Sequence, residues 1–278
     1  MLALKKTILG ISDLKSLFQS IKSFYSDDYS NYAISSLKRR IEEFMFSFHM
    51  LNIDELINKL EKDKTLYQLF IDAIQVETTE MFRDPEFWVQ FRDLVLKKYR
   101  YAKEIKVWIP DCNSGEELYS LQIILHQLKM NEKTSVYVST ITDKNVETIK
   151  KATIDHKKME LNIANFDRYE EGAKLTDYFI LKSNAALLNA ELLDNVKVEK
   201  RNLFTDEHQG VYDCILYRNK MLYYNPQLKN EALKRLNTSL KPGGYIAVGI
   251  KESVDFPSWE REFIVISESE RIYKKVLA

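Results

Sequence analysis

The sequence predicts an α/β protein in which a small all-helical domain precedes a domain built on a mainly parallel, doubly wound sheet. Two observations lead to this prediction. Over the first ~90 residues, apolar side chains recur three and four positions apart, as on one face of a helix, and no strand pattern is convincing. From about residue 103, short apolar runs alternate with helical patterns of about 10 to 15 residues, which is typical of parallel strands joined by helices.

The helical part contains three apolar stripes. The spacing within each stripe places its members on one face of a helix, so the helices are expected to pack together through these residues. The stripes are Leu37, Ile41, Phe44 and Phe48; Ile53, Leu56, Ile57 and Leu60; and Leu66, Phe70 and Ile74.

The second part contains five apolar runs that predict parallel strands and two that predict a closing antiparallel hairpin. Helices are expected from Glu116, around residues 146–152, and in a segment that ends near Leu240. The parallel runs are IKVWI (105–109), SVYVST (135–140), NVKVE (195–199), DCILY (213–217) and YIAVGI (245–250), and the hairpin runs are FIVIS (263–267) and RIYKKV (271–276).

These patterns predict a helical domain at residues 1–75, a linker with a short helix at 76–102, and the sheet domain at 103–278. An insertion at about 153–195 is too long for a simple connection and too irregular for one helix. Within it, residues 174–200 contain no glycine, and residues 184–193 resemble a helical turn more than a hairpin. Because tight hairpin turns favour glycine, a compact three-stranded sheet is not expected there.

Composition excludes several classes of function. The 278 residues include 41 basic and 41 acidic side chains, and this zero net charge disfavours a general binder of nucleic acid or of membrane surfaces. No apolar run reaches the ~18 residues of a membrane span, and the N-terminal stretch lacks the pattern of a signal peptide, so a soluble, cytoplasmic protein is expected. Two cysteines and four scattered histidines predict neither disulfides nor a metal site, and only 7 glycines disfavour a glycine-rich phosphate loop.

In a parallel sheet of this kind, a ligand binds beyond the carboxyl ends of the strands. The loops expected there are 110–115, 139–143, 200–206 and 218–224. The first of them leads into a helix that starts with Glu116 and Glu117. These carboxylates could simply complement the helix dipole, but they would also repel a phosphate and attract a cationic amine or sulfonium. The charge therefore favours S-adenosylmethionine over a dinucleotide as the ligand.

Six motifs resemble those of the chemotaxis receptor methyltransferase (CheR) family, in that family's order and spacing, along nearly the whole chain. LKRRIEEFM (37–45) is similar to the basic helix of the family's amino-terminal domain, and VETTEMFRDPEFW (76–88) to N-x-T-x-F-F-R-[DE]-P-x-x-F. VWIPDCNSGEELYS (107–120), RNLF (201–204), ILYRNKMLYY (215–224) and LKPGGYIAVGIKES (240–253) resemble V-W-x-A-G-C-S-T-G-E-E-P-Y-S, N-L-[LF], I-x-C-R-N-V-L-I-Y-F and L-x-P-G-G-x-L-x-x-G-H-S-E.

The resemblance implies a Rossmann-like domain that binds S-adenosylmethionine, releases S-adenosylhomocysteine and methylates glutamate carboxylates of chemoreceptors. Arg83 and Tyr223 would serve the transfer, with Thr79 also facing the methyl end. Glu116 would bind the methionine amino group, Asn219 would contact the methionine portion, and Asn202 and Leu203 would lie near the adenine. The remaining cofactor positions implied are Gly115, Ile141 and Thr142.

Three of these assignments have a structural alternative. Arg83 could pair with Asp84 or Glu86, Asn219 could satisfy a turn, and Tyr223 could be a packing residue. A glutamate carboxylate is already a nucleophile at neutral pH, so the transfer needs alignment and exclusion of water rather than a general base.

Three departures from the family motifs bear on activity. Ile141 stands where the family has an aspartate that binds both ribose hydroxyls, although Asp143 follows two residues on. Glu77 and Glu80 add negative charge to the second motif, and Pro110 and Asp111 replace small residues beside the cofactor. Two hypotheses therefore stand: a protein-glutamate O-methyltransferase with a modified pocket, or a non-catalytic CheR-like module that binds signalling proteins.

The partner implied by the resemblance is the helical cytoplasmic region of chemoreceptors or related signalling proteins. Lys38, Arg39 and Arg40 would form the basic face that docks on it, and a solvated helix face is the alternative. No nucleic acid, no membrane insertion and a monomer are expected. Some family members also tether to a receptor peptide through a three-stranded insertion, and because no such insertion is expected here, peptide tethering is not expected either.

Overall fold

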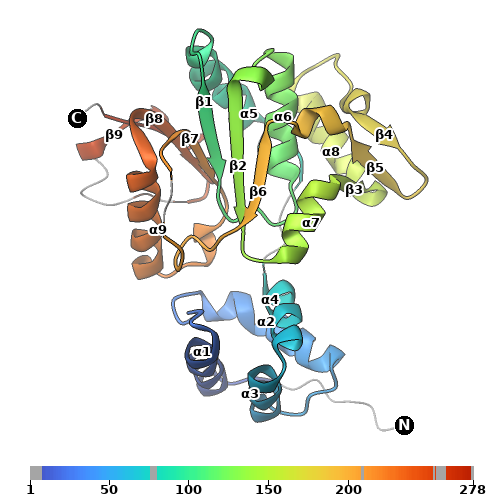
Figure 1. Ribbon diagram of the computed structural model, residues 1–278, viewed down its shortest axis with the longest axis vertical. Helices are drawn as coiled ribbons and strands as arrows, with labels where there is room; N and C mark the ends of the chain where they lie inside the picture. The colour runs from blue at the N-terminus through green and yellow to red at the C-terminus, as the bar shows by residue number, and fades with distance from the viewer. Residues whose placement is uncertain (1–7, 76–79, 208–209, 253, 255–260, 277–278) are drawn as a thin grey trace. The chain divides into compact units, whose positions relative to one another are not determined.

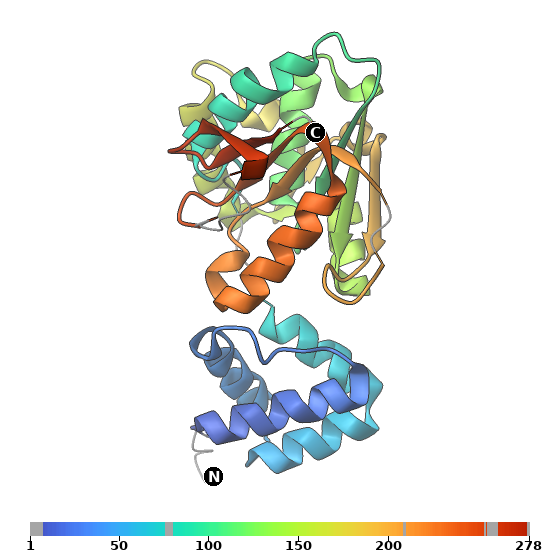
Figure 2. The same ribbon diagram turned by 90° about the vertical axis from the view of Figure 1, so that its left-hand side faces the viewer.

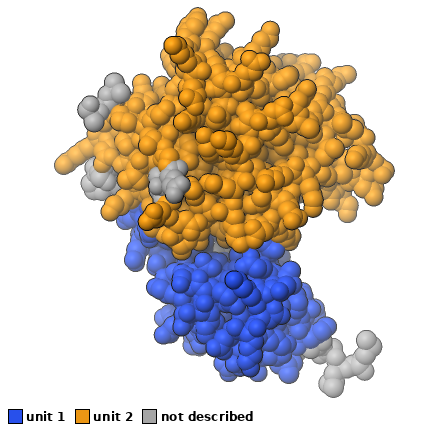
Figure 3. All heavy atoms as spheres, in the orientation of Figure 1, with its two compact units in different colours: residues 1–76, 223–231 blue, residues 77–222, 232–278 orange. Residues whose placement is uncertain are grey.

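The computed structural model describes residues 8–75, 80–207, 210–252, 254 and 261–276. Two compact units divide the chain, as Figure 3 shows. The first unit consists of Met1–Val76 together with Tyr223–Glu231, and the second of Glu77–Leu222 together with Ala232–Ala278. Among the described residues, no helix has the length and apolar character that a membrane span would need.

The described residues of the first unit form four complete helices, drawn in blue to cyan in Figure 2: α1 (Ile11–Tyr25), α2 (Ile34–Ser47), α3 (Ile53–Lys62) and α4 (Lys64–Ile74). The side chain of Asn52 caps α3 by accepting from the Glu55 backbone N–H, and that of Asp63 caps α4. The three apolar stripes are buried between the helices, except that Ile57 is half-buried and Phe48, just past the end of α2, is 39% exposed.

The segment 223–231 joins this unit through its backbone. The Ala33 N–H donates to the Tyr223 carbonyl at 2.7 Å, and the Asn225 N–H donates to the Asn31 carbonyl at 2.9 Å. The Tyr224 ring meets that of Tyr32 edge-on, with 5.1 Å between the ring centroids. A segment distant in sequence thus completes the helical unit.

A seven-stranded sheet forms the centre of the second unit, in the order β6-β2-β1-β7-β8-β10-β9 (Figure 1). The first five strands in this order are parallel, and β10 runs antiparallel to both β8 and β9. The predicted fold class is therefore confirmed. The strands are β1 (Ile105–Ile109), β2 (Thr134–Thr140), β6 (Val196–Lys200), β7 (Tyr212–Tyr217), β8 (Leu240–Val248), β9 (Phe263–Ser267) and β10 (Ile272–Lys275).

The helices of the second unit include α5 (Pro85–Gln90), α6 (Glu116–Gln127), α7 (Asp143–Lys151) and α8 (His156–Tyr169), and α9 (Pro226–Ser239) begins in the first unit and ends in the second. A π-helical turn (Phe91–Val95) and a 3₁₀ turn (Leu96–Tyr99) extend α5, and short 3₁₀ turns also occur at Asn131–Lys133, Leu175–Tyr178, Ala190–Leu193 and Met221–Tyr223. The core between sheet and helices is apolar and well filled. Its largest fully buried side chains include Trp88, Trp108, Tyr119 and Tyr217.

The insertion corrects a sequence prediction. A three-stranded antiparallel sheet, ordered β3-β5-β4, forms from β3 (Thr153–Asp155), β4 (Phe179–Leu181) and β5 (Ala185–Leu188), and it packs beside α8 (Figure 1). The expectation that no such sheet would form was wrong, because the β4–β5 turn needs no glycine. Three residues connect the strands, the Lys182 N–H donates to the Ala185 carbonyl at 2.8 Å, and none of the three has a positive φ.

Candidate active site

A small cavity opens beyond the carboxyl ends of β1 and β7, where the sequence predicted the ligand. Three segments line it: the turn before α5 together with α5 itself, the β1–α6 loop with the start of α6, and the loop after β7. The lining residues are Glu80, Arg83 and Trp88; Cys112, Asn113, Ser114, Gly115 and Glu117; and Arg218, Asn219 and Lys220.

The turn before α5 holds Arg83 in a constrained backbone. Phe82 and Asp84, on either side of it, both have left-handed backbones, with φ of 52° and 56°. Such conformations cost roughly 1–3 kcal/mol in non-glycine residues, so surrounding contacts must hold them. The Phe82 N–H donates to Ser120 Oγ at 2.8 Å, and the buried Phe82 ring packs against Phe166 and Tyr169.

Gly115 allows the β1–α6 loop to enter the helix tightly. Its φ is +97°, and a Cβ at this position would lie 2.4 Å from the Tyr119 hydroxyl oxygen. Tyr119 is itself fixed, because its buried hydroxyl donates to the Ile149 carbonyl at 3.0 Å. A side chain at position 115 would therefore displace the helix start that faces the cavity.

Arg218 is the central cation of the site. It is only 4% exposed, and it pairs with Asp84 at 2.8 Å and with Glu117 at 3.4 Å. Its guanidinium carbon lies 3.7 Å from the centroid of the Phe87 ring, so one face of the cation is covered. Within the described residues, the buried Nε–H of Arg218 has no hydrogen-bond partner.

Burial changes the acid strength of the groups around this cation. It raises the pKa of Glu117 above its ordinary value, while Arg218 and Lys220 act in the opposite direction. It also raises the pKa of Asp111, whose carboxylate accepts from the Tyr217 hydroxyl at 3.0 Å, and that of the Cys112 thiol to about 12. Cys112 therefore stays protonated near neutral pH and is unsuited to act as a nucleophile.

The loop after β7 is anchored by the buried side chain of Glu252, which is 2% exposed. One carboxylate oxygen accepts from the Asn219 and Gly249 N–H groups at 2.9 and 2.5 Å. The other oxygen accepts from the Met221 and Leu222 N–H groups at 2.6 and 3.3 Å. Asn219 has a left-handed backbone, with a φ of 61°, which turns the loop toward the cavity.

Comparison with known proteins decides the family. The family model described as "CheR methyltransferase, SAM binding domain" matches residues 77–272, most of the chain. The chain belongs to the CheR methyltransferase family. The resemblance stated from the motifs is thereby confirmed, and S-adenosylmethionine is the cofactor.

Similar proteins cover nearly the same length. The Pseudomonas putida protein Cher3 is 28% identical over 263 residues, which are 95% of this chain and 96% of that protein. A chemotaxis protein methyltransferase of Listeria monocytogenes is 25% identical over 233 residues, or 83% of this chain and 86% of its own. Among solved structures, the N-methyltransferase NodS of Bradyrhizobium japonicum in complex with S-adenosyl-L-homocysteine has a TM-score of 0.40 at 9% identity, covering 70% of this chain and 88% of NodS.

The groups that line the cavity of this CheR methyltransferase suit the methionine end of S-adenosylmethionine, which carries one amine, one carboxylate and the sulfonium. Glu117, which lines the cavity, would face the cationic groups. The orphaned Nε–H of Arg218 is a donor in need of an acceptor, such as a carboxylate. Gly115 keeps the helix start open to the ligand.

The predicted site residues fall into three groups. Arg83, Gly115 and Asn219 line the cavity together. Glu116 lies beside it, but its carboxylate, 2% exposed, pairs with Lys158 of α8 at 3.0 Å, and the next residue, Glu117, is the one that lines the cavity. Thr79 lies outside the described residues, as does Glu77.

The second group borders β2 and β6. Ile141 is half-buried, and Thr142 caps α7 by accepting from the Asn145 N–H at 3.2 Å. Asp143 is 76% exposed and pairs at 2.8 Å with Lys200, the residue of β6 that lies opposite Thr140 at the end of β2. Asn202 closes a turn by accepting from the Phe204 N–H at 2.9 Å, and Leu203 is buried.

The third group belongs to the first unit. Tyr223 is half-buried there and offers its carbonyl to Ala33. On α2, Lys38 pairs with Glu42 at 3.8 Å and Arg39 with Glu43 at 2.8 Å, so part of the basic face is neutralised within the helix. Arg40 is half-buried.

Sequence reasoning did not single out Arg218, Lys220 or Glu252, and it named Glu117 only as a charge at the start of the helix. The signal for Arg218 and Lys220 was present, since each lies in a matched motif next to Asn219. Lys220 stands where the motif I-x-C-R-N-V has valine, and a new cation beside a cofactor position is a recognisable departure. Glu252 falls on the glutamate that ends the motif L-x-P-G-G-x-L-x-x-G-H-S-E, so a signal was present for it too, although three of its four backbone partners lie about 30 residues away in the chain.

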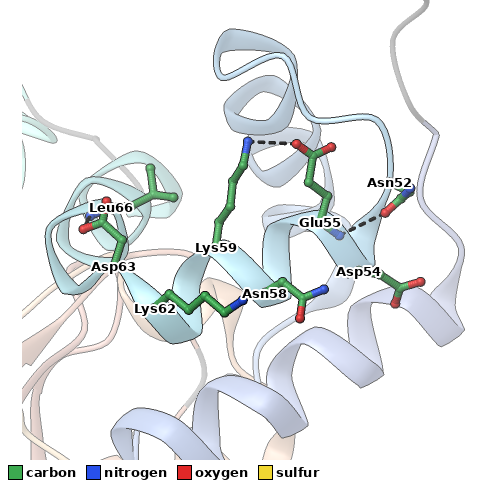
Figure 4. Close-up of a pocket in the computed structure, with 8 residues that line it drawn as sticks. All are labelled: Asn52, Asp54, Glu55, Asn58, Lys59, Lys62, Asp63 and Leu66. Carbon is green, nitrogen blue, oxygen red and sulfur yellow. Dashed lines mark hydrogen bonds and ion pairs between the residues drawn. The ribbon is translucent and has the colours of Figure 1, made fainter.

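A second hollow lies on the first unit, along α3 and the start of α4 (Figure 4). It has a volume of about 640 Å³ and is lined mostly by polar side chains of both charges. Lys59 is held by Glu55 at 2.8 Å, and the Asn52 side chain caps the helix, so these groups are used within α3 itself. Among the described residues, no group of three or more potential metal ligands occurs.

Proposed function

We propose that this CheR methyltransferase transfers methyl groups to glutamate carboxylates on the helical cytoplasmic region of chemoreceptor-type proteins. The supporting observation is a pair of cations, Arg83 and Lys220, that line the cavity beside the cofactor-binding residues. Within the ranges that the structure describes, neither side chain forms an ion pair. A carboxylate acceptor would give both cations a partner. The relatives named chemotaxis protein methyltransferase agree with such a substrate.

Methyl transfer requires little from the protein beyond alignment of the acceptor carboxylate with the methyl group. When bound, S-adenosylmethionine supplies a methyl group that the adjoining sulfonium makes electrophilic. Arg83 and Lys220 would orient the acceptor carboxylate, which is already ionised at neutral pH and needs no general base. Glu117 and Arg218 would hold the amine and carboxylate of the methionine end. The buried aromatic wall of Phe87 and Trp88 would exclude water.

The assignments made from sequence stay part of this proposal. Arg83 and Tyr223 are the proposed catalytic residues, and a cytoplasmic monomer that docks through Lys38, Arg39 and Arg40 is the proposed form. In addition to Glu117 and Arg218, the cofactor contacts proposed from the motifs are Thr79, Arg83, Gly115, Glu116, Ile141, Thr142, Asn202, Leu203 and Asn219.

Methyl transfer can be tested with S-adenosylmethionine labelled in its methyl group and a helical receptor fragment. We expect label on the fragment that mild alkali releases as methanol, because carboxyl methyl esters hydrolyse there whereas N-methyl groups do not. Arg83→Met should lower the rate at least tenfold, since one of two orienting cations is lost. Alkali-stable label would contradict the carboxylate substrate.

A non-catalytic module is the second candidate, favoured by one observation. Ile141 offers no hydrogen bond at the end of β2, and Asp143 is paired with Lys200 instead. On this alternative the chain would bind the receptor fragment but transfer no label, and calorimetry would detect no binding of S-adenosylhomocysteine. Measurable cofactor binding together with transfer would exclude it.

A further inference from the structure

The loop after β7 carries three of the residues that line the cavity, Arg218, Asn219 and Lys220. It has no regular secondary structure up to the 3₁₀ turn at Met221–Tyr223, so its path is not set by a helix or strand ladder. Instead, Glu252 accepts four backbone hydrogen bonds that hold the loop in place. Three of these donors belong to the loop, and the fourth is Gly249 at the end of β8.

The loop after β7 is packed tightly against Gly249 and Glu252. Gly249 lies so close to the loop that a Cβ there would be 2.5 Å from Asn219 Oδ1 and 2.8 Å from the Asn219 nitrogen. Each carboxylate oxygen of Glu252 accepts from two N–H groups, so both oxygens are fully used. A glutamine in either orientation would direct its NH₂ group at two backbone donors.

We propose that Glu252 is a positioning residue of the active site: its carboxylate holds the loop after β7 in the conformation that places Arg218 and Asn219 at the cofactor. Glu252 itself does not line the cavity, and its carboxylate acts through the backbone N–H groups of Asn219, Met221 and Leu222. The cofactor part of this inference rests on the proposed function, whereas the anchoring of the loop does not.

Burial raises the pKa of Glu252 above its ordinary value, which means that the folded state favours the neutral form relative to the unfolded chain. A neutral residue of the same shape relieves the cost of burying the charge, but it also leaves two buried backbone N–H groups without an acceptor. Glu252→Gln should therefore release the loop after β7.

The test compares Glu252→Gln with Glu262→Gln, a control in which a carboxylate that accepts from Asn237 is changed in the same way. Amide hydrogen exchange is read at residues 219, 221 and 222, and the affinity for S-adenosylhomocysteine is read by calorimetry. For Glu252→Gln we expect exchange at least tenfold faster at these amides and about tenfold weaker affinity, with neither change in the control. Glu252→Asp, which keeps the charge but is one methylene shorter, should fall between the wild type and the glutamine variant.

Unchanged exchange at these amides in Glu252→Gln would overturn the inference. Faster exchange with unchanged affinity would overturn its cofactor part and leave only a structural anchor. If the wild type itself binds no S-adenosylhomocysteine, the proposed function fails, and the exchange measurement still decides whether Glu252 anchors the loop. Should Glu252→Gln not fold, the aspartate variant gives the same two readouts.

Discussion

Single residues at the cavity border carry unusual backbone strain. Phe82, Asp84, Asp111 and Asn219 all have positive φ although none is glycine. Hydrogen bonds hold three of them: Ser120 binds Phe82, Arg218 binds Asp84, and Glu252 binds Asn219. Strain of this kind persists only where the surroundings impose it, and its concentration here agrees with a site that is shaped before the ligand arrives.

The first prediction concerns the end of β2. Ile141→Asp should tighten the binding of S-adenosylhomocysteine about tenfold or more, because a carboxylate can accept charge-assisted hydrogen bonds from the ribose hydroxyls, each worth about 1.5–3 kcal/mol. Calorimetric titration of both forms measures the change. Ile141→Leu keeps the apolar volume and should leave the affinity unchanged. Equal affinity of the aspartate variant and the wild type would show that position 141 does not face the ribose.

Sequence motifs could identify cavity residues but not their pairing. Arg83, Gly115 and Asn219 were named from motifs, and they do line one cavity. The choice between Glu116 and Glu117 could not be made, because adjacent positions of a helix start differ in direction and only the packing of α8 shows that Lys158 takes Glu116. The buried charge of Arg218 depends on Asp84, which is distant in the chain.

At the scale of elements, α2 tests the docking hypothesis. Arg39 is the best single target, since its side chain is 82% exposed and its pair with Glu43 is a surface contact that contributes little to stability. Lys38 is less suitable, because its partner Glu42 also accepts from the Leu9 N–H at 3.0 Å and helps to hold the start of α1.

We therefore predict that Arg39→Glu weakens binding to an acidic helical receptor fragment about fivefold to tenfold, while the melting temperature stays within a few degrees. Fluorescence anisotropy of the labelled fragment at low salt measures the affinity. Lys15→Glu, an exposed charge reversal on α1, is the matched control. The docking hypothesis fails if both variants bind the fragment as the wild type does, or if both weaken it equally.

The insertion shows why short elements escape sequence analysis. Strands of three or four residues give too few positions for an alternating pattern. The absence of glycine does not exclude a turn either, because the three-residue loop between β4 and β5 forms without a positive φ. The long parallel strands and the amphipathic helices were predicted because each spans several periods of its pattern. With the sheet present, the argument against peptide tethering loses its premise. Ile180 and Leu181 are more than half exposed on β4, which is an edge strand of that sheet.

At the scale of the whole molecule, the chain leaves the first unit, builds most of the second, and supplies residues 223–231 to the first before it completes the second. Sequence analysis placed a boundary near residue 75 and could not foresee this return, because the hydrogen bonds between residues 31–33 and 223–225 link positions about 190 residues apart. The helical unit is therefore not a simple N-terminal domain.

This connectivity predicts that the fragment 1–76 alone is less stable than the same unit in the full chain. Without residues 223–231 it loses the backbone bonds at Asn31 and Ala33 and the aromatic contact of Tyr32 with Tyr224. Each hydrogen bond contributes roughly 1 kcal/mol, and the aromatic contact adds to this. The loss is therefore a large part of the free energy of unfolding of a domain of this size. Thermal melting followed by circular dichroism should show a transition several degrees lower, or no cooperative transition.

Joining residues 223–231 to the fragment through a glycine–serine linker should raise the midpoint again, whereas a linker of equal length with a scrambled segment should not. If fragment 1–76 already melts at the temperature of the linked form, the returning segment contributes nothing to the unit, and the division of the chain into a separate N-terminal domain is the better description.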